Sequence, residues 1–528
     1  MIGAVPDTAP TRLGELLGAL SLATDLGAGL PLETSLRLCV LASRLAERVG
    51  LDGGVDRGEV RRVALLRHLG CTAWSHEAAR LAGDDHDVLT AFAGVDRASR
   101  AKVAGRALTQ LARDASLGRR VAAVAKVMTH PGAGDALVSA QCNQAVALAT
   151  DLHLPDGVGA ALGQMYERHD GRGAPHGVAG DAIRPAARLL HLAELVEIYH
   201  RTQGRDAALA EVRRRRGKHV APALADAFLA EPAPLWEVLE SASVWDDYLA
   251  GEPAEEPTQD LEGIARAFGR YADLKSPYML GHATAVADLV AAACEDAAAR
   301  PRARIAALLH DLGTVSVPNA IWDKPGPLGA MEWERVRLHG YYTQRILAQS
   351  PHLADVAAIA GAHHERLDGS GYHRGATAPM LEREARLIAA ADAFQAMREV
   401  RPHRPARPLA DAAEQLAADA RAGKLCPRAV DAVLAAAGAP RPERSLPGGL
   451  TPREVDVLVH LARGATNKEI AVALGIAVRT EAPIFVSESV MVKAKMVNTE
   501  KDEEETKKFK SFVENVSPED FIKYSEKQ

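Results

Sequence analysis

Seven side chains between residues 282 and 392 are of the types that bind hard divalent cations. The set contains only imidazoles and carboxylates, with no cysteine: His282, His310, Asp311, His339, His363, His364 and Asp392. Such donors suit a pair of iron or manganese ions and argue against a structural zinc site. Two neighbouring cations can clamp a phosphoryl group for in-line attack. A lone histidine in an Ala- and Leu-rich helix is usually a surface or core residue, but seven candidates in this order predict a metal centre.

These residues lie in one segment, 258–440, whose motifs resemble those of a known family. The matching strings are DLKSPYMLGHATAVADL, ALLHDLGTVSVPNAIWDKPGPL, RLHGYYTQRIL, GAHHERLDGSGYH and LIAAADAFQAM. Together they are similar to the HD-GYP branch of the HD phosphohydrolase superfamily. The resemblance implies an all-helical domain that hydrolyses cyclic di-GMP or a related cyclic dinucleotide. It also implies that the seven residues are metal ligands, and we expect Asp311 to bridge the two ions.

Four more residues are candidates for contact with the substrate or for catalysis. Gly371 and Tyr372 fall where the signature loop of the family lines the substrate cleft. Thr314 stands where the family normally has a Lys, and a hydroxyl can donate one hydrogen bond but carries no charge to offset phosphate. Arg374 is chosen from its charge alone.

Two other positions depart from the family pattern. His373 replaces the proline of the Gly-Tyr-Pro triplet, so the rigid turn is lost. Tyr278 occupies the place of a Glu that three-metal members carry, which favours a two-metal site. We expect metal binding to survive these changes, whereas rate and substrate identity depend on them.

Length and composition restrict the class of protein. At 528 residues, 47% of them hydrophobic, the chain should form three or four globular domains. A formal net charge of −6 gives no general attraction for nucleic acid or anionic membranes. The five cysteines are scattered without a CxxC pair, the N-terminus lacks a signal-peptide pattern, and no apolar run reaches about 18 residues. We therefore expect a cytoplasmic protein without a membrane span.

An internal repeat extends the fold prediction upstream. The string YERHDGRGAPHGVAGDAIRPAARLLHLAELVEIY (166–199) aligns without a gap against 364–397, 198 residues later. Apolar residues recur at three- and four-residue spacing in both copies, which is typical of helices. The repeat predicts two tandem all-α domains of the HD type, 1–250 and 258–440.

The upstream copy lacks the metal-binding side chains. At the equivalent positions it has Thr34, Arg67, His68, Gln141, Met165, Tyr166 and Glu194. Because Met165 and Arg67 cannot serve as ligands for a hard cation, this copy is predicted to be non-catalytic: one half of a pseudo-dimer, a sensor pocket or plain scaffold. His169, His176 and His191 are expected to bind nothing. The run 213–216 is either a nucleic-acid patch or, as we favour, a solvated helix end.

A third region, 447–480, resembles a LuxR-type DNA-binding domain. Two capping boxes, at 451–454 and 466–469, open two short helices of a helix-turn-helix. Arg453 and Lys468 could contact phosphate, but the expected recognition helix is missing. From residue 481 the composition changes, the last arginine being Arg479, and Pro483 would interrupt a helix. The tail 481–528 is predicted to follow a junction between unrelated sequences, or else to be an appended strand and two helices.

These patterns support two functions. The first is a phosphodiesterase with two divalent ions, acting on a cyclic dinucleotide or another phosphodiester in a signalling protein. The second is a LuxR-type transcriptional regulator whose HD domains sense a nucleotide without turnover. DNA binding is expected to be weak or absent, no membrane partner is expected, and a homodimer is considered.

Overall fold

The computed structural model describes residues 12–49, 55–82, 84–110, 133–252 and 260–440, with a few isolated residues besides. The chain divides into two compact units, 1–441 and 442–528. The described residues form helices and isolated bridges without any sheet, which confirms the all-α prediction. The helix-turn-helix segment with Arg453 and Lys468, and the elements predicted for the tail, lie outside the described residues.

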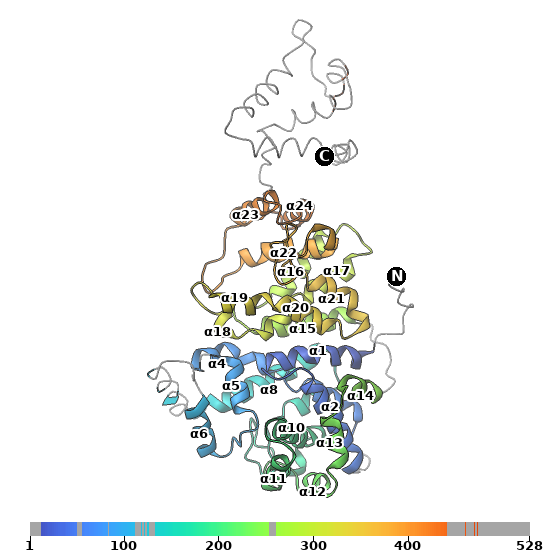
Figure 1. Cartoon of the computed structure of the whole chain (residues 1–528), viewed down its shortest axis with the longest axis vertical. Helices are drawn as coiled ribbons and strands as arrows, with labels where there is room; N and C mark the ends of the chain where they lie inside the picture. Colours follow the sequence, from blue (N-terminus) through green and yellow to red (C-terminus); the bar gives the residue numbers. More distant parts are fainter. Residues whose placement is uncertain are drawn as a thin grey trace. The chain divides into compact units, whose positions relative to one another are not determined.

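The upstream half, residues 12–252, is built from short and medium helices (Figure 1). In chain order they are α1 (Leu13–Gly27), α2 (Thr34–Val49), α3 (Arg57–Leu65), η1 (Cys71–Trp74), α4 (Ser75–Ala82), α5 (Asp85–Phe92), α6 (Arg100–Gln110), α8 (Ala133–Asp151), α9 (Asp156–Leu162), η2 (Gly180–Ala182), α10 (Pro185–Gln203), α11 (Arg205–Arg215), α12 (Pro222–Ala230), α13 (Ala233–Leu239) and α14 (Val244–Ala250).

The downstream half, residues 260–440, carries the predicted metal centre. Its helices are α15 (Leu261–Asp273), α16 (His282–Ala293), α17 (Arg300–Leu309), η3 (Leu312–Ser316), α18 (Asn319–Trp322), α19 (Ala330–Arg337), α20 (His339–Leu347), η4 (Pro351–Leu353), α21 (Ala354–Ala360), η5 (Ala378–Met380), α22 (Arg383–Arg398), α23 (Leu409–Arg421) and α24 (Pro427–Ala436).

The two halves repeat one structural device at their first helix pair. Asp25, near the end of α1, accepts the backbone N–H of Ser35 in α2 at 3.0 Å. Asp273, at the end of α15, accepts the N–H of Ala283 in α16 at 3.2 Å. In each case a buried carboxylate binds an N–H at the start of the next helix, where backbone donors lack partners. The repeat seen in the sequence therefore extends to details of local structure.

The glycine-rich loop also recurs for a steric reason. Gly171 and Gly369 have φ values of 71° and 78°, which favour glycine. A Cβ on Gly371 would lie 2.5 Å from the Cα of Glu365, so the close chain crossing requires glycine there too. The Glu365 carboxylate accepts two backbone N–H groups of the loop, at 3.1 and 2.9 Å. These contacts fix the loop that follows the two adjacent histidines.

The halves pack against each other along α1 and α15 (Figure 1). The hydroxyl of Tyr271 donates to the carbonyl of Ala23 at 3.2 Å. Lys275 and Asp85 form an ion pair at 2.5 Å in which both side chains are 0% exposed. The apolar core is continuous through both halves. The domain boundaries predicted at 1–250 and 258–440 remain predictions.

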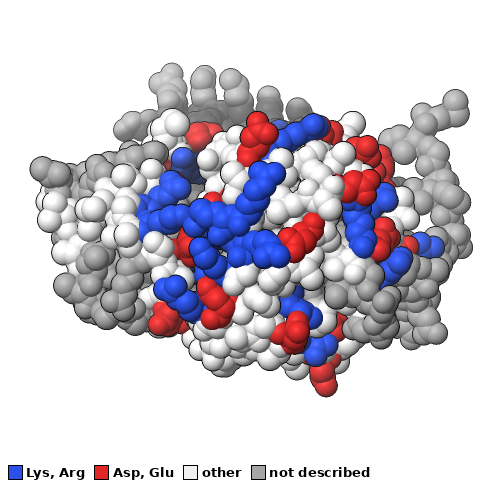
Figure 2. All heavy atoms as spheres, turned by 90° about the horizontal axis from the view of Figure 1, so that it is seen from below, with Lys and Arg blue, Asp and Glu red and all other residues white. Residues whose placement is uncertain are grey.

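The arginine run 213–216 closes α11 on the face of the upstream half shown in Figure 2, where basic and acidic side chains stand together. Arg214 and Arg215 both pair with Glu211, and Arg216 pairs with Asp226 at 2.6 Å. Local carboxylates thus offset most of this charge. Arg213 and Arg216 are exposed as expected of a solvated helix end, whereas Arg215 is buried. Among the described helices, none has the length and apolar content to cross a membrane.

Candidate metal centre

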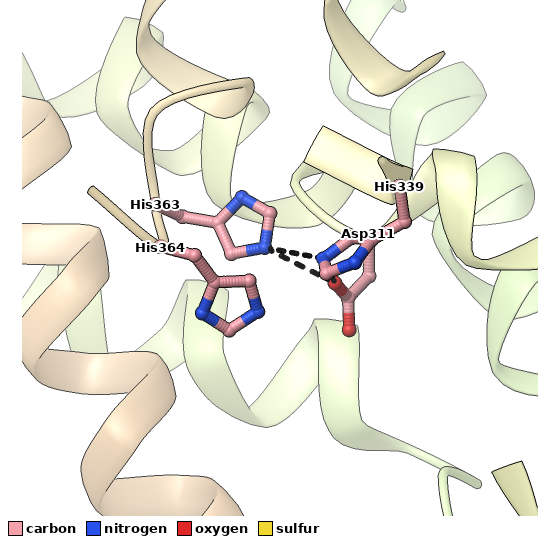
Figure 3. A group of neighbouring side chains, drawn as sticks. All are labelled: Asp311, His339, His363 and His364. Carbon is pink, nitrogen blue, oxygen red and sulfur yellow. Dashed lines mark hydrogen bonds and ion pairs between the residues drawn. The ribbon is translucent and has the colours of Figure 1, made fainter. Parts of the chain in front are cut away.

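Helix ends bring the seven predicted ligands together. His282 and His339 are the first residues of α16 and α20, and Asp392 lies within α22. His310 and Asp311 join α17 to η3, while His363 and His364 follow α21. Four of these side chains converge in Figure 3. The seven fall into two clusters of potential ligand atoms: Asp311, His339, His363 and His364, and His282, His310 and Asp392.

Asp311 lies between the two clusters and faces both. Its Oδ1 is 3.4 Å from Nε2 of His339 and 3.3 Å from Nε2 of His363. Its Oδ2 is 3.5 Å from Nε2 of His310 and 3.8 Å from Nε2 of His282. Burial alone would raise the pKa of Asp311, but these histidines hold it well below its usual range. The carboxylate is therefore ionised and has one oxygen for each cluster.

The second carboxylate completes the other cluster. Asp392 Oδ1 is 3.2 Å from Nε2 of His282 and 4.0 Å from Nε2 of His310. Its Oδ2 is 3.6 Å from Nδ1 of His364. Two buried carboxylates and five imidazoles thus share one small volume. Such a concentration of lone pairs is stable only when a cation or protons lie among them.

Backbone carbonyls select the ring nitrogens that face the centre. Nδ1 of His310 and Nδ1 of His363 each lie 2.7 Å from the carbonyl oxygen three residues earlier. Nδ1 of His339 lies against the carbonyl of Val336 in the same way. A ring that donates from Nδ1 presents an unprotonated Nε2, which is the form that binds metals.

Two of these nitrogens meet directly. Nε2 of His339 and Nε2 of His363 are 3.0 Å apart in the interior. If both rings donate from Nδ1, both Nε2 atoms present lone pairs to one another. Nε2 of His310, which is 0% exposed, has no hydrogen-bond partner among the described residues. The donor set therefore fits divalent cations bound among these nitrogens.

Glu399, which the sequence analysis did not single out, contacts His282 at the edge of the centre. Its carboxylate lies 2.9 Å from Nδ1 of His282 and is held by Arg401 at 2.7 Å and Gln395 at 2.9 Å. Burial lowers the pKa of His282, but hydrogen bonds to Asp392 and Glu399 outweigh it and raise that pKa to about 10. No sequence signal marked it, because Glu399 directly follows the last residue of α22 and only the fold brings it to His282.

The four other candidates are placed differently from one another. Thr314 is 1% exposed, and its hydroxyl donates to the carbonyl of Asp311 at 2.6 Å. Its only O–H is thus already used, and a contact with phosphate would need this bond to break. The ring of Tyr372 lies tilted against that of His364 with 4.3 Å between the centroids, so it borders the centre. Gly371 supports the loop beneath it, while Arg374 is exposed and binds Gln344.

In the upstream half the equivalent positions also gather, but as an ion pair. Arg67 Nε donates to Glu194 at 3.0 Å, and the hydroxyl of Tyr166 donates to Gln141 at 2.7 Å. A guanidinium cannot ligate a cation, and it repels one. The upstream centre is thus unsuited to metal, in agreement with the interpretation from the sequence.

Comparisons with known proteins place both halves in one family. A family model described as HD domain matches residues 135–224 and 266–427. A second model, for bacterial regulatory proteins of the luxR family, matches residues 449–480. The first model covers the glycine-rich loop in each half, all seven predicted ligands downstream and four of their counterparts upstream.

Several relatives have described activities. The 3'3'-cGAMP-specific phosphodiesterase 3 of Vibrio cholerae serotype O1 is 31% identical over 413 residues, which cover 75% of this chain and 88% of the relative. The cyclic di-GMP phosphodiesterase of Thermotoga maritima is 40% identical over 134 residues, 25% of this chain and 36% of the relative. A crystal structure of the cyclic GMP-AMP-specific phosphodiesterase V-cGAP3 of V. cholerae matches with a TM-score of 0.56 and 26% identity, covering 81% of this chain and 98% of that one. The chain therefore belongs to the HD-GYP branch of the HD domain family.

Proposed function

We propose that this protein is a metal-dependent phosphodiesterase that hydrolyses a cyclic dinucleotide. The observation that carries the proposal is Asp311, whose two oxygens each face two imidazole nitrogens within 3.8 Å. The relatives support the substrate class, because they are described as acting on 3'3'-cGAMP or cyclic di-GMP. Cyclic di-GMP and 3'3'-cGAMP are the first substrates to test.

Two divalent ions, iron or manganese, are the proposed cofactors. Asp311 would lie between them, and the remaining ligands would be His282, His310, His339, His363, His364 and Asp392. When bound, such ions polarise phosphoryl oxygens and lower the pKa of a coordinated water. Imidazole and carboxylate donors without thiolate suit these metals.

The residues around the centre would orient the phosphodiester. Burial raises the pKa of Tyr372 to about 12, so its phenol keeps its proton and can donate to a phosphate or ribose oxygen. Gly371 holds the loop in place below it, and Arg374 offers positive charge at the exposed rim. Thr314, held by the carbonyl of Asp311, positions the metal-binding carboxylate instead of the substrate.

Turnover of cyclic dinucleotides tests this proposal. The full chain, loaded with manganese or iron, is expected to linearise cyclic di-GMP or 3'3'-cGAMP. The double variant His310→Ala with Asp311→Ala should lose activity by at least about 1,000-fold, since both clusters lose ligands. Glu414→Gln, on the exposed face of α23, serves as the control. Activity that persists in the double variant, or an inactive but fully metal-loaded protein, contradicts the proposal.

The luxR-family match at 449–480 supports a second role, a transcriptional regulator that senses a nucleotide without turnover. The match stops where the recognition helix would begin, so we propose weak or no sequence-specific DNA binding. A mobility-shift assay checks this: a specific, salt-dependent shift would contradict it.

Two further parts of the proposal concern location and assembly. We propose a cytoplasmic location, inferred from the five free cysteines, and a homodimer.

A further inference from the structure

The upstream half contains a cavity at the place that the metal centre occupies downstream. Its volume is about 120 Å³, and its lining includes Arg67, His68, Tyr166 and Glu194. These are the counterparts of His310, Asp311, His364 and Asp392 in the repeat. The position that binds metal in one half has thus remained hollow in the other, with different side chains around it.

The lining of this cavity is rich in guanidinium groups. Arg67, Arg97, Arg168 and Arg215 all border it, against two carboxylates, Glu194 and Glu197. Arg67 is neutralised by Glu194 through two hydrogen bonds at 3.0 and 3.2 Å. Arg168 and Arg215 are likewise held by carboxylates, at 2.7 and 2.6 Å. Three of the four guanidinium groups that line the cavity are therefore held in place by carboxylates.

Arg97 differs from the other three. It is exposed, and its guanidinium lies 4.7 Å from the ring centroid of Tyr166. The guanidinium of Arg67 lies 4.6 Å from the same centroid. No carboxylate of the described residues lies within ion-pair distance of Arg97. Among the described residues, the Arg97 charge that borders the cavity therefore has no carboxylate partner.

His68 supplies an independent indication of a ligand. Its side chain is 6% exposed and lines the cavity, and its Nε2 has no hydrogen-bond partner among the described residues. Burial and the neighbouring Arg67 lower the pKa of His68 to about 3, so the ring is neutral. A buried nitrogen without a partner is costly, so a polar ligand in the cavity would stabilise the fold.

We propose that this cavity binds the phosphate group of a phosphomonoester, such as the 5'-phosphate of a nucleotide. Arg97 would offset part of the phosphate charge, His68 would meet one of its oxygens, and Tyr166 would form one wall. The cavity volume of about 120 Å³ leaves room for a phosphate group. Because the side chains at this place are not metal ligands, we expect the site to bind the phosphate without hydrolysing it.

Calorimetric titration of the full chain tests the proposal. The Asp311→Ala background, without added metal, removes phosphate binding at the downstream centre and makes the result independent of phosphodiesterase activity. The probes are inorganic phosphate, 5'-GMP and 5'-AMP, with guanosine as the ligand that lacks phosphate. We expect one phosphate-dependent site per chain and no binding of guanosine. Equal affinity for inorganic phosphate and for the nucleotides would show that the site recognises only the phosphate group. Tighter binding of a nucleotide would show that the site also contacts the nucleoside.

Arg97→Ala is the decisive variant, because an exposed side chain can be removed without disturbing the core. It should weaken binding by at least about tenfold, the effect of losing one charge-assisted contact. Arg213→Ala, an exposed arginine in α11, should leave the affinity unchanged. No binding of any phosphate probe, or equal affinities of the two variants, would overturn the proposal.

Discussion

At the scale of residues, the geometry of the imidazole rings decides what the centre can bind. Carbonyl oxygens fix three rings through Nδ1, while Glu399 fixes His282 through the same atom at 2.9 Å. Partners of this kind hold a ring in the orientation that a metal requires and increase its basicity. We therefore expect Glu399 to position the ring of His282.

Glu399→Gln should weaken metal affinity by about 10- to 100-fold, since the amide cannot offer a full negative charge to His282. Competition with a chromophoric chelator measures the dissociation constant directly. Glu414→Gln, at an exposed position, is the matched control and should behave as the wild type. Equal metal affinity in both variants would show that Glu399 does not position His282.

The grouping of the seven candidate ligands could be predicted from sequence because hard-cation donors in a fixed order are rare among Ala- and Leu-rich helices. Glu399 and the carbonyl partners could not, because nothing in a lone glutamate distinguishes a surface charge from a partner of His282. Thr314 shows that a motif does not reveal the hydrogen bonds of its side chains. Its place in the motif suggested a substrate contact, but only the fold reveals that its hydroxyl is bound to Asp311.

At the scale of elements, buried carboxylates at the α1–α2 and α15–α16 junctions make stability depend on pH. Burial raises the pKa of Asp25 from 3.8 to about 8. The folded state thus binds this proton more tightly than the unfolded chain. Its contribution to stability is complete below about pH 4 and is lost as the pH rises through about 8.

Asp25→Asn should remove this contribution. The free energy of unfolding of the variant, relative to that of the wild type, should increase between pH 4 and 8. Urea unfolding at several pH values measures the difference, with Asp411→Asn, an exposed position in α23, as control. A constant difference between variant and wild type across this range would contradict the assignment.

The loop after α21 should be intolerant of a side chain at Gly371. Because a Cβ there would lie 2.5 Å from the Cα of Glu365, backbone must move. Gly371→Ala is expected to lower stability by about 1–3 kcal/mol and to reduce turnover with it. Gly105→Ala, in the middle of α6 with nothing within 4 Å, should instead be neutral or slightly stabilising. Thermal unfolding compares the two.

At the scale of the whole molecule, the upstream half contacts the catalytic motif itself. Nε2 of His86, in α5, lies 3.1 Å from the carbonyl of Val315 in η3, directly after the His310–Asp311 pair. Beside it, Asp85 pairs with Lys275 without solvent exposure. The sequence predicted two tandem copies of one fold, but these partners are 190 residues apart and complementary only in space. No local pattern could have paired them.

Lys275→Met should lower the free energy of unfolding by about 3–5 kcal/mol, because it leaves the Asp85 charge buried without a partner. The double variant with Asp85→Leu should regain part of this loss. Lys324→Met, which breaks a half-exposed pair with Glu332, should cost at most about 1 kcal/mol. Urea unfolding measures both losses. An equal loss in Lys275→Met and Lys324→Met would show that the Lys275–Asp85 pair contributes little to stability.

The central proposal is that the downstream half would hold two divalent ions, with Asp311 as a ligand. Elemental analysis of the manganese- or iron-loaded full chain, after removal of free metal, measures this most directly. The account predicts two ions per chain in the wild type and a loss of metal from both clusters in Asp311→Ala, with the upstream half holding none. A wild type without bound metal, or an Asp311→Ala variant with the full complement, would contradict it.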